Sequence, residues 1–575
     1  MGGMTRRGFI GAGLAAGMAV QGGCAPTRER GLPRTTGNKR PARTLRADVV
    51  IIGGGLGGCA AALTALEAGC TVVMTEESAW PGGQATSQAV PPDENRWVET
   101  FGATRAYQDY RNRVRGYYRR NYPLTDAARA AKFLNPGNGG VSALCHEPCV
   151  SEAVLREMLA PHIAGERLTL LTGHAPLAAE TRGDTVAAVA VRGMEDGETV
   201  SLEGKLFLDA TETGELLPLA GVEHVTGTEA RGDTGELHAP AQARPGNMQA
   251  CTWCFAMEHR AGENHVIDRP ENYGFWRGRT PKMSPPWSGP LLSLDTIHPV
   301  TLKPRSMPFD PTCRTGPGWW TYRRILDRGN FRDGFLKGDV TVVNWPQNDY
   351  LDGNPFGGTA GENARHMEGA RQLSLSLFYW LQTEAPRPDG GAGWPGLRLR
   401  GDLTGTRDGL AMRPYIRESR RIRAEFTVLE GHVGREQRAA ETGRGDGVTA
   451  AQFPDSAGIG FYRIDLHPST GGDNYIDIDS MPFQIPLGAL IPARVENLLP
   501  ACKNIGTTHI TNGCYRLHPV EWNIGEAAGA LAARCVLTGA SPRAVRNTPE
   551  KLAEFQKDLS RRGVPLAWPE EVRAG

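Results

Sequence analysis

The feature that most constrains the fold of this chain is a glycine-rich turn between a short apolar segment and a helical one. Residues 47–52 are apolar and β-branched, which is typical of a strand buried in the centre of a parallel sheet. Glycines follow at Gly53, Gly55 and Gly58, where a tight turn lets the backbone approach a pyrophosphate and lets the next helix lie close to the strand. An alanine-rich helix is expected from Leu56, so its amino terminus would face the phosphates.

An acidic residue follows this unit at the spacing that a dinucleotide site requires. Residues 71–75 are predicted to form the second strand, and Glu76 ends it about twenty residues after the glycines. A carboxylate at this point can accept hydrogen bonds from the ribose hydroxyls. Chance matches occur in a chain with 73 glycines, but here strand, glycines, helix, strand and acid agree. The sequence therefore predicts a dinucleotide site, and these residues alone leave NAD and FAD open.

Two later segments resemble the FAD-binding domain of the glutathione-reductase-like flavoproteins. Residues 80–87 form a second glycine-rich turn, which in those proteins passes the flavin end of the cofactor. Residues 206–214 are an apolar strand followed by DATETG, a variant of the Asp-Ala-Thr-Gly turn that returns to the phosphate and ribose side. The resemblance implies FAD as the cofactor, with further contacts at Gly83, Gln84, Ala210 and Thr211.

A segment near the carboxyl end extends this resemblance. Residues 497–506 predict a strand and a turn that ends at Gly506, and a small-residue helix is expected to open at Gly525 and Glu526. In the resembled flavoproteins this helix points its amino terminus at the flavin pyrimidine ring, where negative charge gathers on reduction. Gly506, Gly525 and Glu526 are therefore implied as cofactor contacts.

The chain from residue 47 to about residue 539 is similar to the bacterial FAD-dependent oxidoreductase family. The shared phrases are NWPQNDY, PYIRESRR and DLHPS, at residues 344–350, 414–421 and 465–469. The resemblance implies an α/β fold, in which a Rossmann-like, glutathione-reductase-like FAD-binding domain carries an inserted mixed β/α substrate domain, the cap. The expected boundaries are residues 47–235 and 485–545 for the FAD-binding domain, 236–484 for the cap, and 546–575 for a C-terminal helix and tail.

Composition excludes several classes of function. The formal net charge of +1, with 22% charged residues, provides no global field that would attract nucleic acid. No apolar run approaches the 18 or so residues of a membrane span, so no span is expected. At 575 residues the chain exceeds one typical domain of about 100–200 residues, which favours at least two domains.

The first residues resemble a leader for the Tat export route, which carries folded proteins. Arg6 and Arg7 form a twin-arginine pair before a short apolar region at residues 10–20. Cys24 follows two glycines and is a candidate for lipid attachment, although Gln21 stands where a lipobox has an aliphatic residue. Up to residue 46 the chain is rich in arginine, proline and threonine, so a disordered tether is expected. The protein would then be periplasmic or extracellular, with a lipid anchor left open.

Two pairs of cysteines raise redox and metal interpretations. Cys251 and Cys254 form a CxxC motif, and Cys145 and Cys149 stand on either side of His146. A zinc site would need a second matching pair, and a thioredoxin-like site would need its own βαβ unit. We therefore expect buried small side chains or one structural disulfide, and no metal site.

The candidate catalytic residues are histidines in segments that are expected to return to the flavin. Residues 462–467 alternate in polarity, which predicts a half-buried strand with Asp465 and His467 on one face, so that Asp465 would orient His467. Oxidation of an alcohol or amine needs a base for the heteroatom proton, and histidine is suited near neutral pH. His518 and His509, close to the closing helix, are alternative bases. For each histidine, a structural role is an equally good interpretation.

Arginines and an asparagine are the candidate substrate contacts. Arg417 and Arg421 could clamp a carboxylate, although Glu418 is an immediate partner and such a run is more often an ion-paired face. Asn348 stands beside aromatic residues, a mixture that suits a sugar, but asparagine next to Pro346 also simply builds turns.

The direction of electron flow follows from what the sequence lacks. No second strand-GxGxxG-helix unit follows Gly58, so no NAD(P)H domain is expected and electrons should come from an organic substrate. The acceptor is left open between oxygen, a quinone and a periplasmic carrier. The leading hypothesis is a dehydrogenase or oxidase that moves a hydride from a small polar molecule, such as a carbohydrate-like alcohol, to flavin N5. The rivals are a redox-neutral lyase or isomerase with structural or internally cycling FAD, and a binding protein that keeps FAD without catalysis.

Overall fold

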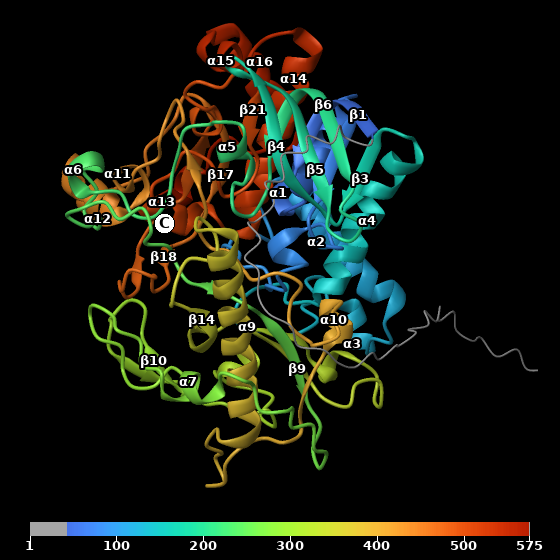
Figure 1. The fold of residues 1–575 in the computed structure, drawn as a ribbon, viewed down its shortest axis with the longest axis vertical. Coiled ribbons are helices and arrows are strands. Elements are labelled where there is room, and N and C mark those ends of the chain that lie inside the picture. Colours follow the sequence, from blue (N-terminus) through green and yellow to red (C-terminus); the bar gives the residue numbers. More distant parts are fainter. Residues whose placement is uncertain (1–42, 574–575) are drawn as a thin grey trace, which may run out of the picture. The chain divides into compact units, whose positions relative to one another are not determined.

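The computed structural model describes residues 43–573 (Figure 1). The predicted glycine turn directly follows β1, a strand of the principal sheet. The strand order is β3-β2-β1-β6-β5-β4, and β21 also pairs with β6. Pairing is parallel from β3 to β6 and between β6 and β21, whereas β5 is antiparallel to both of its neighbours. The strands are β1 (Arg43–Ile52), β2 (Val72–Glu76), β3 (Leu168–Thr172), β4 (His174–Arg182), β5 (Thr185–Gly193), β6 (Thr199–Asp209) and β21 (Leu498–Pro500).

Two helices that are far apart in the sequence pack together beside this sheet. Helix α1 (Leu56–Glu67) follows β1 and is buried at every position from Leu56 to Leu66. Its partner is α14 (His518–Thr538), which is also buried over most of its length (Figure 1). A helix that is apolar on all sides has to be covered on all sides, and the sheet and α14 together do this. The remaining helices near the sheet include α2 (Arg105–Asn121), α4 (Pro148–Ala164), α15 (Pro542–Asn547) and α16 (Pro549–Arg562).

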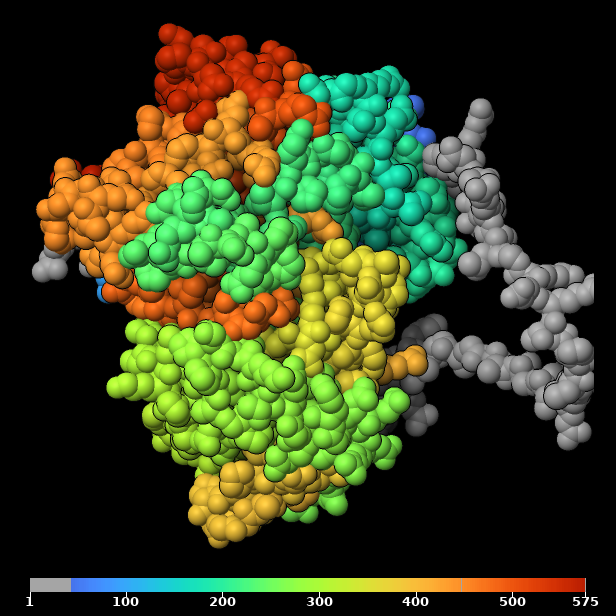
Figure 2. Space-filling view, turned by 60° about the vertical axis from the view of Figure 1, so that its left-hand side comes forward, coloured from blue at the N-terminus to red at the C-terminus, as the bar shows by residue number. Residues whose placement is uncertain are grey.

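The second region of the chain is a mixture of short antiparallel pairs around one long helix. Its largest sheet has the order β12-β13-β9-β15, and α9 (Ala360–Thr383) begins with a capping box made by Thr359 and Glu362. In Figure 2 the stretch from β10 to α9, coloured light green to yellow, forms the lower part of the visible face. The strands are β8 (Cys251–Thr252), β9 (Phe255–His259), β10 (Asp295–Ile297), β11 (Pro304–Ser306), β12 (Arg324–Leu326), β13 (Val340–Val343), β14 (Asp349–Tyr350), β15 (Leu397–Leu399), β17 (Ser456–Gly460), β18 (Ile464–Leu466), β19 (Ile476–Ile478) and β20 (Phe483–Pro486).

The α/β fold and most long elements agree with the sequence, and two boundaries differ. β1 begins at Arg43, four residues before the expected start, because Arg43 to Arg46 continue the pairing with β6 although their side chains are largely exposed. α14 begins at His518 instead of Gly525, since Pro519 stands in its first turn, where proline is well tolerated. The predicted domain boundaries at residues 235 and 484 stay predictions.

Several predictions concern parts of the chain outside the described residues. The twin arginines, Cys24 and the tether up to residue 42 belong to this group. Among the helices of residues 43–573, none combines the length and the apolar character that a membrane crossing requires. The ten cysteines in this range are free thiols, and Cys251 and Cys254 are both buried, as expected for small core side chains.

Candidate functional site

The glycine turn and the acid at the end of β2 are joined by hydrogen bonds. The amide of Gly54 donates to Glu76 Oε2 at 3.0 Å, and the amide of Gly53 donates to Thr75 Oγ1 at 3.1 Å. The other oxygen of Glu76 accepts from the amide and the hydroxyl of Ser78, at 2.9 and 2.7 Å. Burial raises the pKa of Glu76 to about 7, although these hydrogen bonds act in the opposite direction.

Close backbone approach explains why side chains are absent from the turn. Gly53 has φ +95°, and a Cβ at this position would lie 2.4 Å from the backbone of Ala210 and Thr211, which follow β6. A Cβ on Gly58 would lie 2.5 Å from the carbonyl oxygen of Gly53. The turn, the start of α1 and the end of β6 are therefore packed backbone against backbone, as the glycine pattern predicts.

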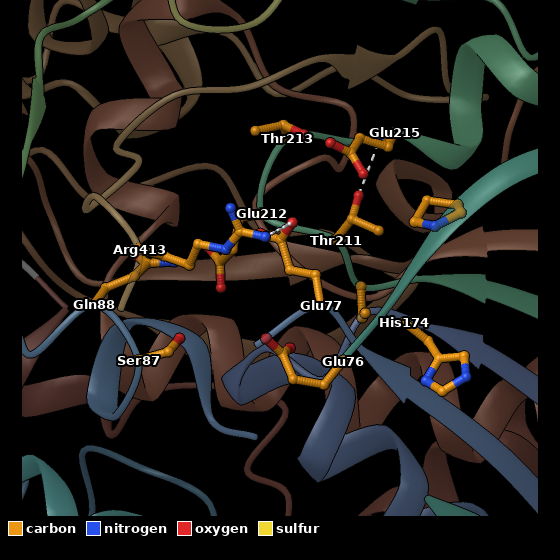
Figure 3. Close-up of a pocket in the computed structure, with 13 residues that line it drawn as sticks. Glu76, Glu77, Ser87, Gln88, His174, Thr211, Glu212, Thr213, Glu215 and Arg413 are labelled. Atoms are coloured by element: carbon orange, nitrogen blue, oxygen red, sulfur yellow. Dashed lines mark hydrogen bonds and ion pairs between the residues drawn. The ribbon is translucent and has the colours of Figure 1, made fainter. Parts of the chain in front are cut away.

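A pocket rich in carboxylates opens beside this turn (Figure 3). It contains about 430 Å³ of empty space, and Figure 3 shows Glu76 and Ser87 on one side of it and Thr211, Thr213 and Glu215 on the other. Carboxylate and hydroxyl oxygens are good acceptors for the hydroxyl groups of a ribose. The other labelled residues are Glu77, Gln88, His174, Glu212 and Arg413.

The positive group that pairs with Glu77 in this pocket is a guanidinium. Arg413 lies 2.7 Å from Glu77 Oε2. Burial raises the pKa of Glu77 to about 8, although the charge of Arg413 acts to lower it. A neutral hydroxyl-bearing group therefore suits this end of the site better than an additional negative charge.

A buried lysine links two further carboxylates at the amino terminus of α1. Lys503 Nζ makes an ion pair with Glu212 and lies 3.4 Å from Glu521 Oε2. Glu521 also accepts from the amide of Gly57 at 3.1 Å and from Gln84 Nε2. The N-cap residue of helix α1, Gly55, has no side chain to cap the first turn, and of the amides there Gly57 is the one that Glu521 already accepts from.

These residues fit a dinucleotide. The glycine turn forms the cradle, Glu76 offers acceptors for a ribose, and the amino terminus of α1 presents backbone amides to phosphates. Within residues 43–573, the buried atoms Gln84 Oε1 and Glu212 Oε1 have no hydrogen-bond partner, which a ligand at this place would supply. A Cβ on Gly83 would lie 2.1 Å from Glu212 Oε1, so the second glycine turn also approaches this crevice without a side chain.

The remaining predicted cofactor residues lie in the packing around this crevice. Gly525 is inside α14, and a Cβ there would lie 2.0 Å from the carbonyl oxygen of Gly57. A Cβ on Gly506 would lie 2.5 Å from Ala424 Cβ. Glu526 is buried, and burial raises its pKa to about 7. Direct contact of these three residues with a cofactor stays a prediction.

A second pocket, with about 940 Å³ of empty space, contains three of the predicted site residues. His467, Asp465 and Arg417 line it. It adjoins the glycine turns, because the backbone oxygen of Arg516, another lining residue, accepts from Gln84 Nε2 at 3.1 Å. Its walls also carry aromatic side chains, namely Trp319, Tyr322, Tyr415, Tyr462 and Tyr475.

The partner that holds His467 is Asp349. His467 Nδ1 lies 2.6 Å from Asp349 Oδ2, whereas Nε2 is 3.9 Å from Asp465 Oδ2. Asp349 therefore makes the closer contact with the ring, and Asp465 also pairs with Arg516 at 3.2 Å, so the orienting role of Asp465 stays a prediction. Asp349 belongs to the NWPQNDY phrase, but it is 118 positions from His467 in the chain, so the sequence pattern did not predict that the two residues meet.

The two alternative histidines lie away from the lining of this pocket. His518 is fully buried, its Nδ1 accepts from the amide of Asp93 at 3.1 Å, and burial lowers its pKa to about 3. His509 Nδ1 lies 2.8 Å from Glu418, which is itself ion-paired with Arg421. The arrangement of His509 resembles a structural hydrogen-bonding role, whereas His518 Nε2 is buried without a partner among the described residues.

Of the predicted substrate contacts, Arg417 alone lines the second pocket. It donates to Asn344 Oδ1 at 3.1 Å and lies 3.2 Å from Asp349 Oδ1. Arg421 is buried in ion pairs with Glu418 and Glu229. Asn348 stabilises its own loop, because its Oδ1 accepts from the amide of Trp345. Its Nδ2 donates to Trp253 O and Ser374 Oγ, which ties the loop to neighbouring segments.

The sequence did not indicate three other arginines that line this pocket. Arg305 and Arg323 are 18 residues apart, Arg516 follows 193 residues after Arg323, and none belongs to a motif. That all three line one pocket is visible only in the folded chain.

A family model described as FAD dependent oxidoreductase matches residues 48–559. No curated protein matches the chain.

Solved structures show distant likenesses. A geranylgeranyl bacteriochlorophyll reductase-like protein from Thermoplasma acidophilum is 11% identical over 91% of this chain and 85% of its own, with a TM-score of 0.31. L-proline dehydrogenase from P. horikoshii is 17% identical over 32% of this chain and 24% of its own, with a TM-score of 0.17. Anhydrotetracycline hydroxylase from Streptomyces rimosus is 13% identical over 66% of this chain and 55% of its own, with a TM-score of 0.26. At these low scores, nothing about the chemistry of this chain is taken from them.

Proposed function

Because the chain belongs to the family of FAD-dependent oxidoreductases, we propose that it oxidises a small polar organic substrate, such as a carbohydrate-like alcohol, as a dehydrogenase or oxidase. FAD is the cofactor of this enzyme. The observation that supports the proposed reaction most directly is His467, which Asp349 holds on the wall of a polar, aromatic pocket next to the glycine turns.

The groups that would hold FAD are those of the first crevice. Glu76 would accept hydrogen bonds from the adenosine ribose, and the amino terminus of α1 with Lys503 would receive the phosphates. Gln84, in the second glycine turn, would lie toward the flavin end. When bound, FAD supplies the hydride acceptor, N5 of its ring.

His467 is suited to remove the proton of a substrate hydroxyl. Its Nδ1 is engaged by Asp349, which leaves Nε2 as the nitrogen available in the pocket. Although burial opposes it, the charge of Arg417 and the hydrogen bond with His467 hold the pKa of the Asp349 carboxyl below its ordinary value. An ionised Asp349 fixes the ring tautomer and stabilises the imidazolium that forms when Nε2 takes the proton.

The walls of the pocket are compatible with a sugar-like ring. Aromatic faces offer stacking surfaces, and Asn344 and Tyr462 add polar groups among them. Asn344 Nδ2 is buried without a hydrogen-bond partner among the described residues, so it can donate to a ligand hydroxyl.

Export and the final electron acceptor belong to the same proposal. The twin arginines Arg6 and Arg7 support export by the Tat route to the periplasm or beyond, and Cys24 is the candidate for a lipid anchor. The acceptor would be oxygen, a quinone or a periplasmic carrier.

Anaerobic mixing tests the reaction. Purified holoprotein is mixed without oxygen with sugars, polyols, amines and hydroxy acids, and flavin absorbance and product are both followed. Bleaching by one of these classes is the expected result. Conversion of a substrate while the flavin stays oxidised throughout would instead identify a redox-neutral lyase or isomerase, and neither bleaching nor conversion would indicate a binding protein.

A further inference from the structure

The second pocket carries more positive than negative side chains. Five arginines and three aspartates line it. Arg463 is paired with Asp477 and Asp479, and Arg516 with Asp465. The positive charge of these two arginines is therefore already balanced from within the protein.

The third paired arginine, Arg417, contacts Asp349, the carboxylate that holds His467. Arg417 lies 3.2 Å from Asp349 and donates to Thr252 Oγ1 at 2.7 Å and to the carbonyl oxygen of Ala250 at 2.9 Å. Its charge is therefore committed to the carboxylate that holds His467.

The other two arginines keep N–H donors without a hydrogen-bond partner. Arg305 has no ion pair and no side-chain hydrogen bond among residues 43–573, and its Nε is buried without a partner. Arg323 is only 8% exposed, and its one carboxylate, Asp93, is 3.5 Å away, which balances its charge but is beyond good hydrogen-bond geometry. Its Nε and Nη1 are also buried without a partner among the described residues. Buried donors in this condition lose hydration without a compensating hydrogen bond.

The two arginines line the same pocket, and they come from one stretch of the chain, 18 residues apart. A guanidinium presents its donors in a planar fork that matches a carboxylate, so either arginine can bind an anion that enters this pocket.

We propose that the substrate is a sugar acid, or another polyhydroxylated carboxylate, and that Arg305 and Arg323 bind its carboxylate. The unpartnered donors of these two arginines carry this inference, and the aromatic walls of the pocket suit the hydroxylated carbon skeleton. The assignment of the reacting hydroxyl to His467 rests on the proposed function, but the carboxylate site itself does not.

Binding without turnover tests the site. Oxidised holoprotein is titrated under air-free conditions by calorimetry and flavin difference absorbance with D-glucuronate, D-galacturonate and D-gluconate, each beside its neutral counterpart D-glucose, D-galactose or D-glucitol. At least one acid should bind about tenfold or more tightly than its neutral counterpart. Arg305→Met should abolish that preference, and Arg305→Lys should restore part of it because the charge returns.

Two further variants control for general effects of charge and folding. Arg328→Met removes an exposed arginine from the same segment and should leave the preference intact. Arg323→Met should reduce the preference as Arg305→Met does. Equal binding of every acid and its neutral counterpart, no binding at all, or a preference that survives both Arg305→Met and Arg323→Met would overturn the proposal. If an acid binds with the expected preference but never reduces the flavin, the carboxylate site stands and the proposed oxidation fails.

Discussion

At the scale of single residues, Asp349 is the group that holds His467 in place. It is 1% exposed and receives His467, Arg417 and Thr252 on its two oxygens. One carboxylate thus fixes the ring of the proposed base and also neutralises a buried guanidinium. Its removal therefore changes catalysis and local packing together, so the informative substitution is the one that preserves shape.

We expect Asp349→Asn to reduce the rate of flavin reduction at least ~10-fold with a smaller change in substrate KM, because the amide no longer stabilises a protonated His467. Stopped-flow reduction under anaerobic conditions measures this. Asp479→Asn, which removes a carboxylate paired with Arg463 and exposed to solvent, should change the rate little. Equal rates for Asp349→Asn and the unmodified protein would remove Asp349 and His467 from the mechanism.

Lys503 is the second residue with a clear consequence. It is 1% exposed and lies between Glu212 and Glu521, so Lys503→Met leaves two buried acids without their cation. FAD affinity should fall, since the same cation also faces the phosphate end of the crevice. Fluorescence titration of the apoprotein with FAD gives the dissociation constant.

A compensating change separates charge balance from direct contact with the cofactor. Adding Glu212→Gln to Lys503→Met should recover part of the FAD affinity, because one uncompensated charge is removed. If the double variant binds FAD no better than Lys503→Met, repulsion by Glu212 is not the cause of the loss.

At the scale of elements, the contact between α1 and α14 is made by backbone at glycine positions. A Cβ on Gly525 would lie 2.0 Å from the carbonyl oxygen of Gly57, and a Cβ on Gly529 would lie 2.4 Å from that of Ala61. The helices can approach this closely only where side chains are absent. The small residues of α14 are therefore required by packing, whatever contact they make with a cofactor.

Gly525→Ala should destabilise the protein by about 1–3 kcal/mol, because its Cβ would overlap the backbone of α1. Urea unfolding followed by circular dichroism measures the loss. The matched control is Gly361→Ala in the first turn of α9, where a Cβ meets nothing within 4 Å, and a change below about 1 kcal/mol is expected there. A similar effect of both substitutions would contradict the packing argument.

The local sequence pattern was sufficient to predict the elements whose residues carry a clear periodicity. The β-branched run of β1, the alanine-rich α1 and Glu76 at the end of β2 follow from short-range patterns, and the alternation over residues 462–467 contains β18. Elements of two residues, such as β8 and β14, carry no period of their own and depend on tertiary pairing. For the same reason the sequence did not show that Asp349 faces His467 or that Arg305 and Arg323 line one pocket.

At the scale of the whole molecule, buried carboxyl groups outside the cofactor crevice couple stability to pH. Burial raises the pKa of Glu147, Glu236 and Glu526 from 4.5 to about 7. Because the folded pKa exceeds the unfolded one, the stabilising contribution is complete below about pH 4.5 and is lost as pH rises through 7. Burial lowers the pKa of His146 to about 4 and of His518 to about 3. These two histidines therefore make the free energy of unfolding rise with pH, but only below about pH 6.5, where the unfolded chain binds their protons.

Between pH 6.5 and pH 8 the free energy of unfolding should therefore fall, by roughly 2 kcal/mol in total for the three acids. Urea unfolding of the holoprotein at constant ionic strength checks this. Glu236→Gln should make the decline shallower, because glutamine does not titrate. Stability that is constant or increases over this interval would contradict the assignment of raised pKa values.

The pairing of β21 with β6 has a consequence for how the protein is made. β6 ends at Asp209, but its neighbour begins only at Leu498, and α14 starts later still, at His518. Some 290 residues intervene, which a ribosome needs roughly 15–60 s to add at 5–20 residues per second. During that interval the apolar face of α1 and one edge of the sheet are uncovered, so the nascent chain is exposed to mispairing. The crevice acquires Lys503 and Glu521 only when synthesis is nearly complete, so stable FAD loading must come at the end of translation or after it.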